Sequence, residues 1–213
     1  MRILFGPPPP DPSFDPQPPW RALREPRHIA AVIVLALPLG ALAAVGYLVL
    51  ALLLHPTGEF VLSFGQGAVV ALLLFVPVHE LLHAVAVPGS LGSPQLVVGV
   101  WPRAALVYVH YNGELGRARW LLVALLPLSA ISLVTLILTQ LVPPWEDFLL
   151  TFGVFNALGS GGDLLAAALV VAGVPRGARL RNQGWRTYWR PPGMESDSAR
   201  CVQSASSSSA ENL

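Results

Sequence analysis

Four long apolar segments constrain this chain of 213 residues more than any other feature. They run from about 29 to 54, 67 to 87, 120 to 142 and 148 to 174. Each has roughly the 20 residues that a helix needs to cross a hydrocarbon layer about 30 Å thick. Only 12% of the residues are charged, against about a quarter in a typical soluble domain. We therefore expect an all-α membrane protein, a bundle of four transmembrane helices.

The arginines predict how this bundle is oriented. They precede the first apolar segment, lie between the second and the third, and follow the fourth, at Arg21, Arg24, Arg27, Arg103, Arg117, Arg119, Arg176, Arg179, Arg181, Arg186 and Arg190. The loops at about 55–66 and 143–147 contain none. Because basic residues are enriched in cytoplasmic loops, we expect a multi-pass protein of the cell membrane with both termini and the middle loop in the cytoplasm.

The two ends of the chain have compositions typical of tails. Residues 1–28 hold nine prolines and lack the apolar core of a secretory signal, so we expect a disordered, extended cytoplasmic arm. Residues 176–213 are first basic and then rich in serine, and the final Glu-Asn-Leu also begins a common protease-tag site. A net charge of +1 gives no reason to expect nucleic acid binding, and the single cysteine, Cys201, excludes an intrachain disulfide.

The middle loop contains a stretch with the composition of strands. Residues 95–113 hold two runs rich in valine, tyrosine and tryptophan around a Trp-Pro-Arg-Ala break. This pattern predicts a small β-hairpin near the cytoplasmic membrane surface, with Tyr108 and His110 on one face of its second strand. The alternative to a hairpin is a short interfacial loop. For His110 two positions are open, one on the surface of the strand and one as a ligand in a metal site.

Three ionisable residues stand close together near the end of the second apolar segment. His79 and His83 are four residues apart, so on a helix both imidazoles lie on one face and can hold one zinc ion. Glu80 lies about 100° round from His79, within reach of a water bound to that metal. The pattern His-Glu-x-x-His therefore predicts two zinc ligands and a catalytic general base.

The membrane setting makes this motif informative. An ionisable group near the bilayer centre costs about 2.5–3.5 kcal/mol, and a bound divalent cation would offset that cost for all three. The alternative is a histidine pair that is hydrogen-bonded to neighbouring helices without metal. Zinc is the expected cofactor, although this kind of ligand set also accepts other divalent ions.

Asp163 is the candidate third metal ligand, because it is the only other acidic residue within an apolar segment. His79 lies 8 residues before Val87, and Asp163 lies 11 residues before Val174. At about 1.5 Å per residue, the two side chains are roughly 12 and 16 Å from the cytoplasmic ends of their helices. Adjacent helices could therefore bring them together.

Two further features surround Asp163 in the sequence. Asn156 lies two helical turns earlier on the same face, and it could donate to a substrate carbonyl or oxyanion, or form an interhelical hydrogen bond. Gly159, Gly161 and Gly162 could serve close helix packing, or could let the helix unwind locally so that Asp163 reaches the metal.

The order of these motifs resembles that of the putative zincin peptidase family, small multi-pass proteins of bacteria and archaea that are similar to site-2 proteases. The resemblance covers about residues 65–175 and rests on HELLHA, LLPL and NALGSGGDLL. It implies a prokaryotic source and peptide-bond hydrolysis. In site-2 proteases the third ligand is an aspartate within Asn-Pro-Asp-Gly. That tetrapeptide is absent here, and Asp163 is the matching position, with Asn156 as a weaker analogue.

We therefore expect residues 29–175 to form a membrane-embedded metallopeptidase domain. His79, His83 and Asp163 would hold zinc, and Glu80 would be the general base in cleavage of a membrane protein or peptide within or beside the bilayer. One alternative is a divalent metal transporter or metal-binding membrane protein, which would not need Glu80 as a base. Another is a catalytically silent membrane scaffold that binds partner helices.

Overall fold

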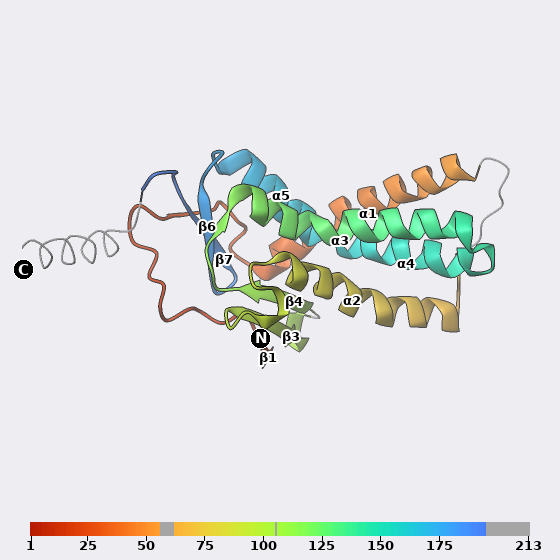
Figure 1. Ribbon diagram of the computed structural model, residues 1–213, viewed down its shortest axis with the longest axis horizontal. Coiled ribbons are helices and arrows are strands. Elements are labelled where there is room, and N and C mark those ends of the chain that lie inside the picture. Colours follow the sequence, from red (N-terminus) through yellow and green to blue (C-terminus); the bar gives the residue numbers. More distant parts are fainter. Residues whose placement is uncertain (56–61, 105, 195–213) are drawn as a thin grey trace, which may run out of the picture.

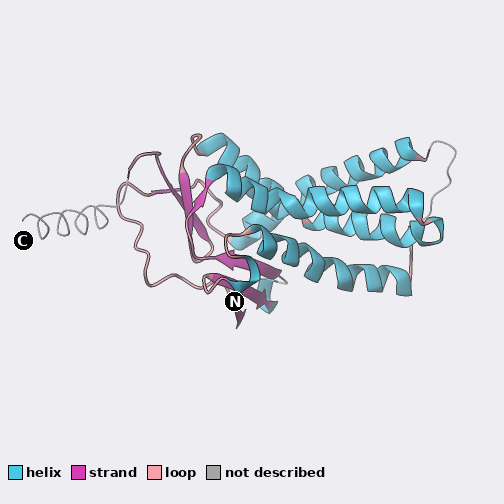
Figure 2. Cartoon of the chain, in the orientation of Figure 1, coloured by secondary structure: helices cyan, strands magenta, loops and turns pink. Residues whose placement is uncertain are grey.

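The computed structural model describes residues 1–55, 62–104 and 106–194, and the serine-rich end with Cys201 lies outside them. The chain is mostly helical with two small sheets (Figures 1 and 2). Three helices are long and apolar enough to cross a membrane: α1 (Ile29–Leu54), α2 (Gln66–Ala86) and α3 (Arg117–Leu141). A fourth crossing exists if α4 (Glu146–Gly159) and α5 (Gly161–Gly173) form one broken span.

The fourth apolar segment bends by 45° where a continuous helix was expected. The break falls at Ser160, whose hydroxyl donates to the Asn156 carbonyl oxygen at 2.7 Å, within a run poor in helix-forming residues. A Cβ on Gly161 would collide with the Ala36 carbonyl oxygen of α1. The glycines therefore allow close packing and also border the break, which leaves Asp163 in the first turn of α5.

The surface of the helices fits a lipid environment. The buried residues of α1 are Gly40, Ala44, Tyr47 and Ala51, and its large aliphatic side chains are mostly exposed. A helix that is apolar on all sides and exposed to its surroundings is typical of a membrane span. Inside the bundle, the Tyr47 hydroxyl is hydrogen-bonded to Thr135 at 2.9 Å, so this buried polar pair is satisfied within the protein.

The first sheet has the strand order β1 (Arg2–Phe5), β3 (Leu96–Trp101) and β4 (Leu106–Tyr111). β3 and β4 are antiparallel and joined by the short 3-10 turn η2 (Pro102–Ala104), so the predicted hairpin is confirmed. Its cytoplasmic location stays a prediction. β1 pairs in parallel with β3 and covers the edge of β3 that faces away from β4. One edge of β4 is therefore left without a strand partner among the described residues.

The register of the hairpin determines which backbone groups face that edge. Asn112 N donates to Gln95 O at 3.1 Å, which identifies Asn112 and Gln95 as a hydrogen-bonded pair. Such pairs alternate along an antiparallel ladder, so His110, Tyr108 and Leu106 also bond to β3. The backbone amides and carbonyls of Val107, Val109 and Tyr111 consequently point toward the unpaired edge.

The second sheet has the order β2 (Arg21–Ala22), β7 (Arg186–Arg190), β6 (Arg179–Gln183) and β5 (Leu115–Gly116). The first part of the expected C-terminal tail thus forms a β-hairpin, and the N-terminal arm contributes β1 and β2. The arm is also held by side chains, since Arg181 binds Asp11 at 2.8 Å and Gln183 donates to the Phe14 carbonyl oxygen at 2.6 Å.

Two expectations are corrected by these sheets. The arm is not disordered where β1 and β2 form, and the all-α class with one hairpin omits five of the seven short strands of the described chain, since it includes only β3 and β4. The physical reason for β1, β2 and β5 is that a strand of two to four residues draws its stability from partners far along the sequence, which its own composition does not reveal. β6 and β7 form a local hairpin with each other, but their arginine-rich composition is not typical of strands.

Both sheets and the N-terminus lie at one end of the helical bundle (Figure 1). α2 ends there, α3 begins there, and the arginines that precede α1 or follow α5 are carried by the same end. The observed arrangement is compatible with a multi-pass membrane protein whose basic end faces the cytoplasm, although that orientation is still a prediction.

The arm should loosen when Asp11 is replaced by asparagine. Burial raises the pKa of Asp11, but hydrogen bonds from Ser13 and Arg181 outweigh it and hold the pKa below the ordinary value of 3.8. The ion pair between Asp11 and Arg181 therefore stabilises the docking of the N-terminal arm against β6 at pH values above 3.8. This contribution is lost as the pH falls through the lowered pKa of Asp11. We expect Asp11→Asn to weaken docking by about 1 kcal/mol.

Hydrogen exchange at the Ser13 and Phe14 amides measures this change, and we expect it to become roughly fivefold faster. Asp15→Asn is the matched control, because exposed Asp15 accepts a hydrogen bond from Gln17 within the arm. Equal exchange rates in wild type and Asp11→Asn would show that the arm is held by its other contacts alone.

Candidate metal centre

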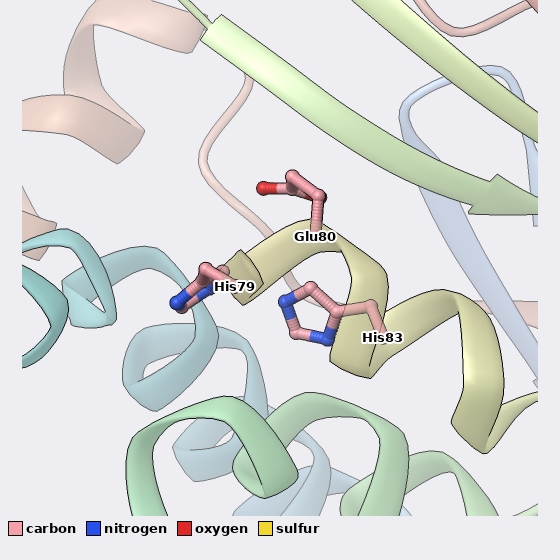
Figure 3. A group of neighbouring side chains, drawn as sticks. All are labelled: His79, Glu80 and His83. Atoms are coloured by element: carbon pink, nitrogen blue, oxygen red, sulfur yellow. The ribbon is translucent and has the colours of Figure 1, made fainter. Parts of the chain in front are cut away.

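α2 carries both histidines of the motif into the interior of the bundle. His79 and His83 are 5% and 8% exposed, and their ring centroids lie 4.9 Å apart on the same side of the helix (Figure 3). α2 ends one turn later at Ala86, whose carbonyl oxygen accepts a hydrogen bond from Arg119 Nε at 2.6 Å. This contact with the start of α3 stabilises the position of the last turn of α2.

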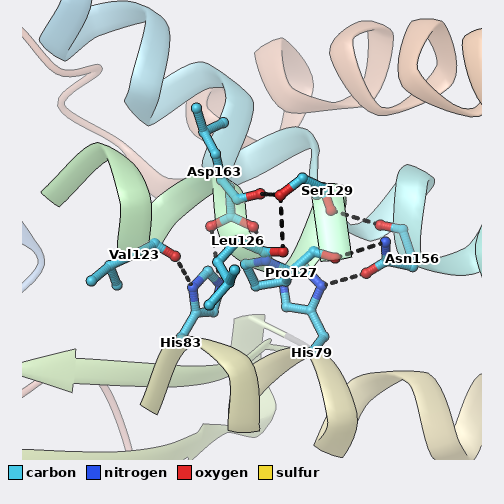
Figure 4. A network of polar contacts seen from close by, with 10 residues as sticks. His79, His83, Val123, Leu126, Pro127, Ser129, Asn156 and Asp163 are labelled. Carbon is cyan, nitrogen blue, oxygen red and sulfur yellow. Dashed lines mark hydrogen bonds and ion pairs between the residues drawn. The ribbon is translucent and has the colours of Figure 1, made fainter. Parts of the chain in front are cut away.

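The structure brings Asp163 to this histidine pair from α5 (Figure 4). Its Oδ2 lies 3.1 Å from His79 Nε2, and its Oδ1 lies 3.5 Å from His83 Nε2. The two helices meet at the depth that the sequence predicts. Asp163 is in the first turn of α5, where the helix dipole favours a negative charge.

Glu80 stands close to the histidines but on a different side of α2 (Figure 3). Ligand atoms of His79, Glu80 and His83 all lie within 4.8 Å of one another, so these three residues alone could also hold a metal ion. We favour Asp163 as the third ligand because each of its oxygens faces a different imidazole at shorter range. That leaves the Glu80 carboxylate beside the site without a place among the three ligands.

A proline in α3 fixes the orientation of His83. Pro127 has no N–H, so the carbonyl oxygen of Val123, four residues earlier, lacks its usual helical donor. His83 Nδ1 lies 2.7 Å from this oxygen. A carbonyl oxygen can only accept, so Nδ1 carries the ring hydrogen. In the neutral ring, the His83 Nε2 lone pair is then directed at Asp163.

Asn156 fixes His79 in the same way. Its Nδ2 donates to the Pro127 carbonyl oxygen at 3.3 Å, which orients the amide so that Oδ1 faces His79 Nδ1 at 2.9 Å. Asn156 is fully buried and both contacts of its side chain are interhelical. Of the two roles considered for it, the structure therefore shows the interhelical hydrogen bond. The amide faces His79 and Pro127, which leaves no geometric support for a contact with substrate.

The donor set fits a divalent cation. Two lone-pair nitrogens and a carboxylate converge without a hydrogen of their own between them, so a proton or a cation must lie among them to offset the repulsion. In a tetrahedral zinc site with bonds of about 2.0–2.1 Å, neighbouring ligand atoms are about 3.3 Å apart. The observed separations of 3.1 and 3.5 Å, each to a different oxygen of Asp163, are close to that value, and the shorter one also fits a direct hydrogen bond.

A cavity of about 310 Å³ opens onto this cluster. Its walls come from α2, β4, α3 and α5, and His79, Glu80, His83 and Asp163 all line it. Val107, Val109 and Tyr111 of the unpaired β4 edge line it as well. The site thus combines a candidate metal-binding cluster, a nearby carboxylate and an open strand edge.

Some of these residues were not predicted from the sequence. The role of the Val123 carbonyl could have been found, because a proline within a predicted span marks a freed carbonyl four residues earlier. The pairing of Asn156 with His79 has no such signal, since it depends on which helices are neighbours. His110 is buried rather than on the surface, and it does not line the cavity that holds the metal cluster.

Comparison with known proteins gives one match. The model of a family described as putative zincin peptidase matches residues 72–179, about half of the chain. The matched stretch includes the histidine motif, the hairpin and Asp163. No curated protein and no solved structure matches the chain.

Pro127→Ala should weaken zinc binding without removing any proposed ligand. Alanine supplies an N–H that bonds to the Val123 carbonyl oxygen, so His83 Nδ1 loses its acceptor and the ring loses its fixed tautomer. Loss of such an outer contact typically lowers metal affinity 10–100-fold, and competition with a zinc chelator measures this. Pro38→Ala is the control, because Pro38 is an exposed proline within α1. Equal zinc affinity in both variants would refute this orienting role.

Proposed function

The chain belongs to the putative zincin peptidase family, and from this premise we propose that it is a zinc-dependent metalloendopeptidase of the site-2-protease type, which cleaves a peptide bond within or next to the membrane. One observation carries the proposal: both imidazoles direct Nε2 at the Asp163 carboxylate while their Nδ1 atoms face fixed acceptors. A transporter would need the ligands, but it would not need a carboxylate such as Glu80 beside them.

His79, His83 and Asp163 are the residues that would hold the metal. A zinc ion there supplies a Lewis acid and lowers the pKa of a bound water to about 7. Val123 and Asn156 keep the imidazoles in the tautomer that binds metal, so the site is organised before substrate arrives.

Glu80 is the proposed general base and acid. Its carboxylate would accept a proton from the attacking water and then donate it to the amine that leaves the cleaved bond. The side chain lines the cavity close to both histidines, and its carboxylate accepts a hydrogen bond from the Val109 amide at the strand edge. A peptide lying along that edge would have its backbone within reach of both.

The position of the site supports cleavage at the edge of the bilayer. His79 lies seven residues before the last residue of α2, roughly 10 Å from the end of the helix. The sheets sit at that same end of the bundle (Figure 1). We propose that this end faces the cytoplasm, so that a membrane-bound substrate reaches the site from the cytoplasmic half of the bilayer.

The substrate would bind in an extended form, because the hydrogen bonds of a helix shield its peptide bonds. The unpaired β4 edge offers the backbone groups of Val107 and Tyr111 and the Val109 carbonyl to such a segment, while the Val109 amide donates to the Glu80 carboxylate. Added strands bind through main-chain hydrogen bonds and therefore tolerate varied sequences. Since β1 already covers the far edge of β3, an added strand would pair with β4 beside the metal site.

Glu80→Gln separates the proposed protease from its alternatives. We expect the variant to keep about one zinc per chain, by metal analysis, and to lose at least 10²–10⁴-fold in peptide cleavage because its base is gone. Asp163→Ala should instead lose zinc. Glu146→Gln is the matched control, because Glu146 lies in the first turn of α4, outside the lining of the metal cavity.

The alternatives give other results. If zinc transport persists in Glu80→Gln and no peptide is cleaved by the wild type, the protein is a transporter. If zinc is absent from the wild type and partner helices still bind, it is a scaffold. Either result would end the protease proposal.

Val107→Pro tests the strand edge. The substitution removes an amide that would bond to substrate while leaving the β3 ladder intact. It also spares the Val109 amide, which donates to the Glu80 carboxylate. We expect KM for a peptide substrate to rise about 5–10-fold, with zinc content unchanged. Val107→Thr is the matched control, since it keeps the amide and the branched shape, and unchanged KM in the proline variant would show that substrate does not pair with β4.

A further inference from the structure

A second cavity of about 250 Å³ lies beside the candidate metal centre. It is bounded by the first turns of α1, by α5, by β4 and by the turn between β6 and β7. Its walls are mainly apolar and include three tryptophans, Trp101, Trp120 and Trp185, together with Tyr108. None of the four proposed catalytic and metal-binding residues lines it, so the proposed chemistry does not account for it.

Two polar atoms of the lining residues have no partner. His110 Nε2 and Asn182 Oδ1 are both buried without a hydrogen bond in the described part of the chain. A buried polar atom without a hydrogen-bond partner destabilises the folded protein. Burial also lowers the pKa of His110, so its ring is neutral at pH 7 and keeps a single N–H. An occupant of the cavity that reaches these two atoms would meet one oxygen that accepts and one imidazole nitrogen that can donate. Glu25 lines the cavity as well, and its Oε2 already accepts from the Thr187 amide.

The two cavities are neighbours. They share seven lining residues, which come from β4, α3, α5 and β6, namely Leu106, Tyr108, Val109, Trp120, Gly162, Ala166 and Asn182. Gly162, which directly precedes Asp163, lines both. A chain bound next to the metal ligands could therefore place a side chain in the second cavity.

The β4 register indicates how that side chain would enter. Residues directly opposite each other on paired strands have their side chains on the same face. Tyr108 and His110 share one face of β4, and both line the second cavity. On a strand added to β4, the residue opposite Tyr108 or His110 would project on that same face.

We propose that this cavity is a specificity subsite for a tyrosine side chain of the substrate. The aromatic walls match the ring. A phenolic hydroxyl can donate to Asn182 Oδ1 and accept from His110 Nε2, which satisfies both lone atoms, whereas phenylalanine satisfies neither. Sites that hydrogen-bond a hydroxyl discriminate against the analogue without it. The assignment to substrate rests on the proposed protease function, whereas binding of the ring itself does not.

The test uses the full chain, loaded with zinc, in lipid nanodiscs. The probes are N-acetyl-tyrosinamide and N-acetyl-phenylalaninamide, and nitrogen NMR of labelled histidine follows the His110 ring. We expect the tyrosine probe to bind about 5–10-fold more tightly and to shift the His110 Nε2 resonance. Equal affinities, or a resonance that does not move, would overturn the subsite without any variant being needed.

In Asn182→Leu, the ratio of the affinities for the tyrosine and phenylalanine probes should fall to about one, because the accepting oxygen is gone. Ser132→Ala is the control: Ser132 Oγ is likewise buried without a partner among the described residues, but the residue lines neither cavity. A preference that survives Asn182→Leu, or disappears in Ser132→Ala, would contradict the assignment.

Digestion of a random peptide library separates this inference from the proposed function. Tyrosine enriched at one fixed distance from the cut supports both. Cleavage without such enrichment overturns the substrate subsite alone. Tyrosine-selective probe binding with no peptide cleaved overturns the protease function, and the cavity then stands as a binding site for tyrosine-like ligands.

Discussion

Ionisable side chains inside an apolar helical bundle are tolerated only when each of their polar atoms has a partner, and the site in this protein follows from that constraint. His79 and His83 present four ring nitrogens to the interior. Two face fixed acceptors, Asn156 Oδ1 and the Val123 carbonyl oxygen, and two face the Asp163 carboxylate. The first pair fixes the tautomers, so the second pair is left for a cation. The geometry that satisfies the burial constraint is thus compatible with the proposed zinc site.

The acceptors and the carboxylate are available because two helices depart from regular geometry. Pro127 frees a carbonyl in α3, and the break at Ser160 places Asp163 in the first turn of a new helix. Irregular backbone within apolar spans is tolerated where it is buried in protein. Close packing of Gly161 against α1 and of Gly159 against Phe75 surrounds the break with neighbouring helices. These departures therefore position the site rather than weaken the bundle.

The sheets add access to this buried cluster. In the first sheet, β1 covers one side and leaves β4 open toward the metal cavity. In the second, ion pairs and strand pairing hold both ends of the described chain against the bundle, with Glu114 bound to Arg190 at 2.9 Å and Asp11 bound to Arg181 at 2.8 Å. Asn182 of that sheet reaches the second cavity. Segments that read as tails in the sequence thus help to form the walls around the proposed substrate path.

By itself, the sequence determined the apolar segments, the histidine motif and the hairpin, because hydropathy, helical spacing and β-branched runs are local signals. Helix depth also brought Asp163 within range of the motif before any contact was known. Only the tertiary structure decided that Asn156 binds His79, that Val123 binds His83, that the fourth segment breaks, and that the arm and tail form strands. Those outcomes depend mostly on which distant segments become neighbours. β1 pairs with β3 and β2 with β7, and pairing between segments so far apart in the chain leaves no mark on the composition of a two- to four-residue strand.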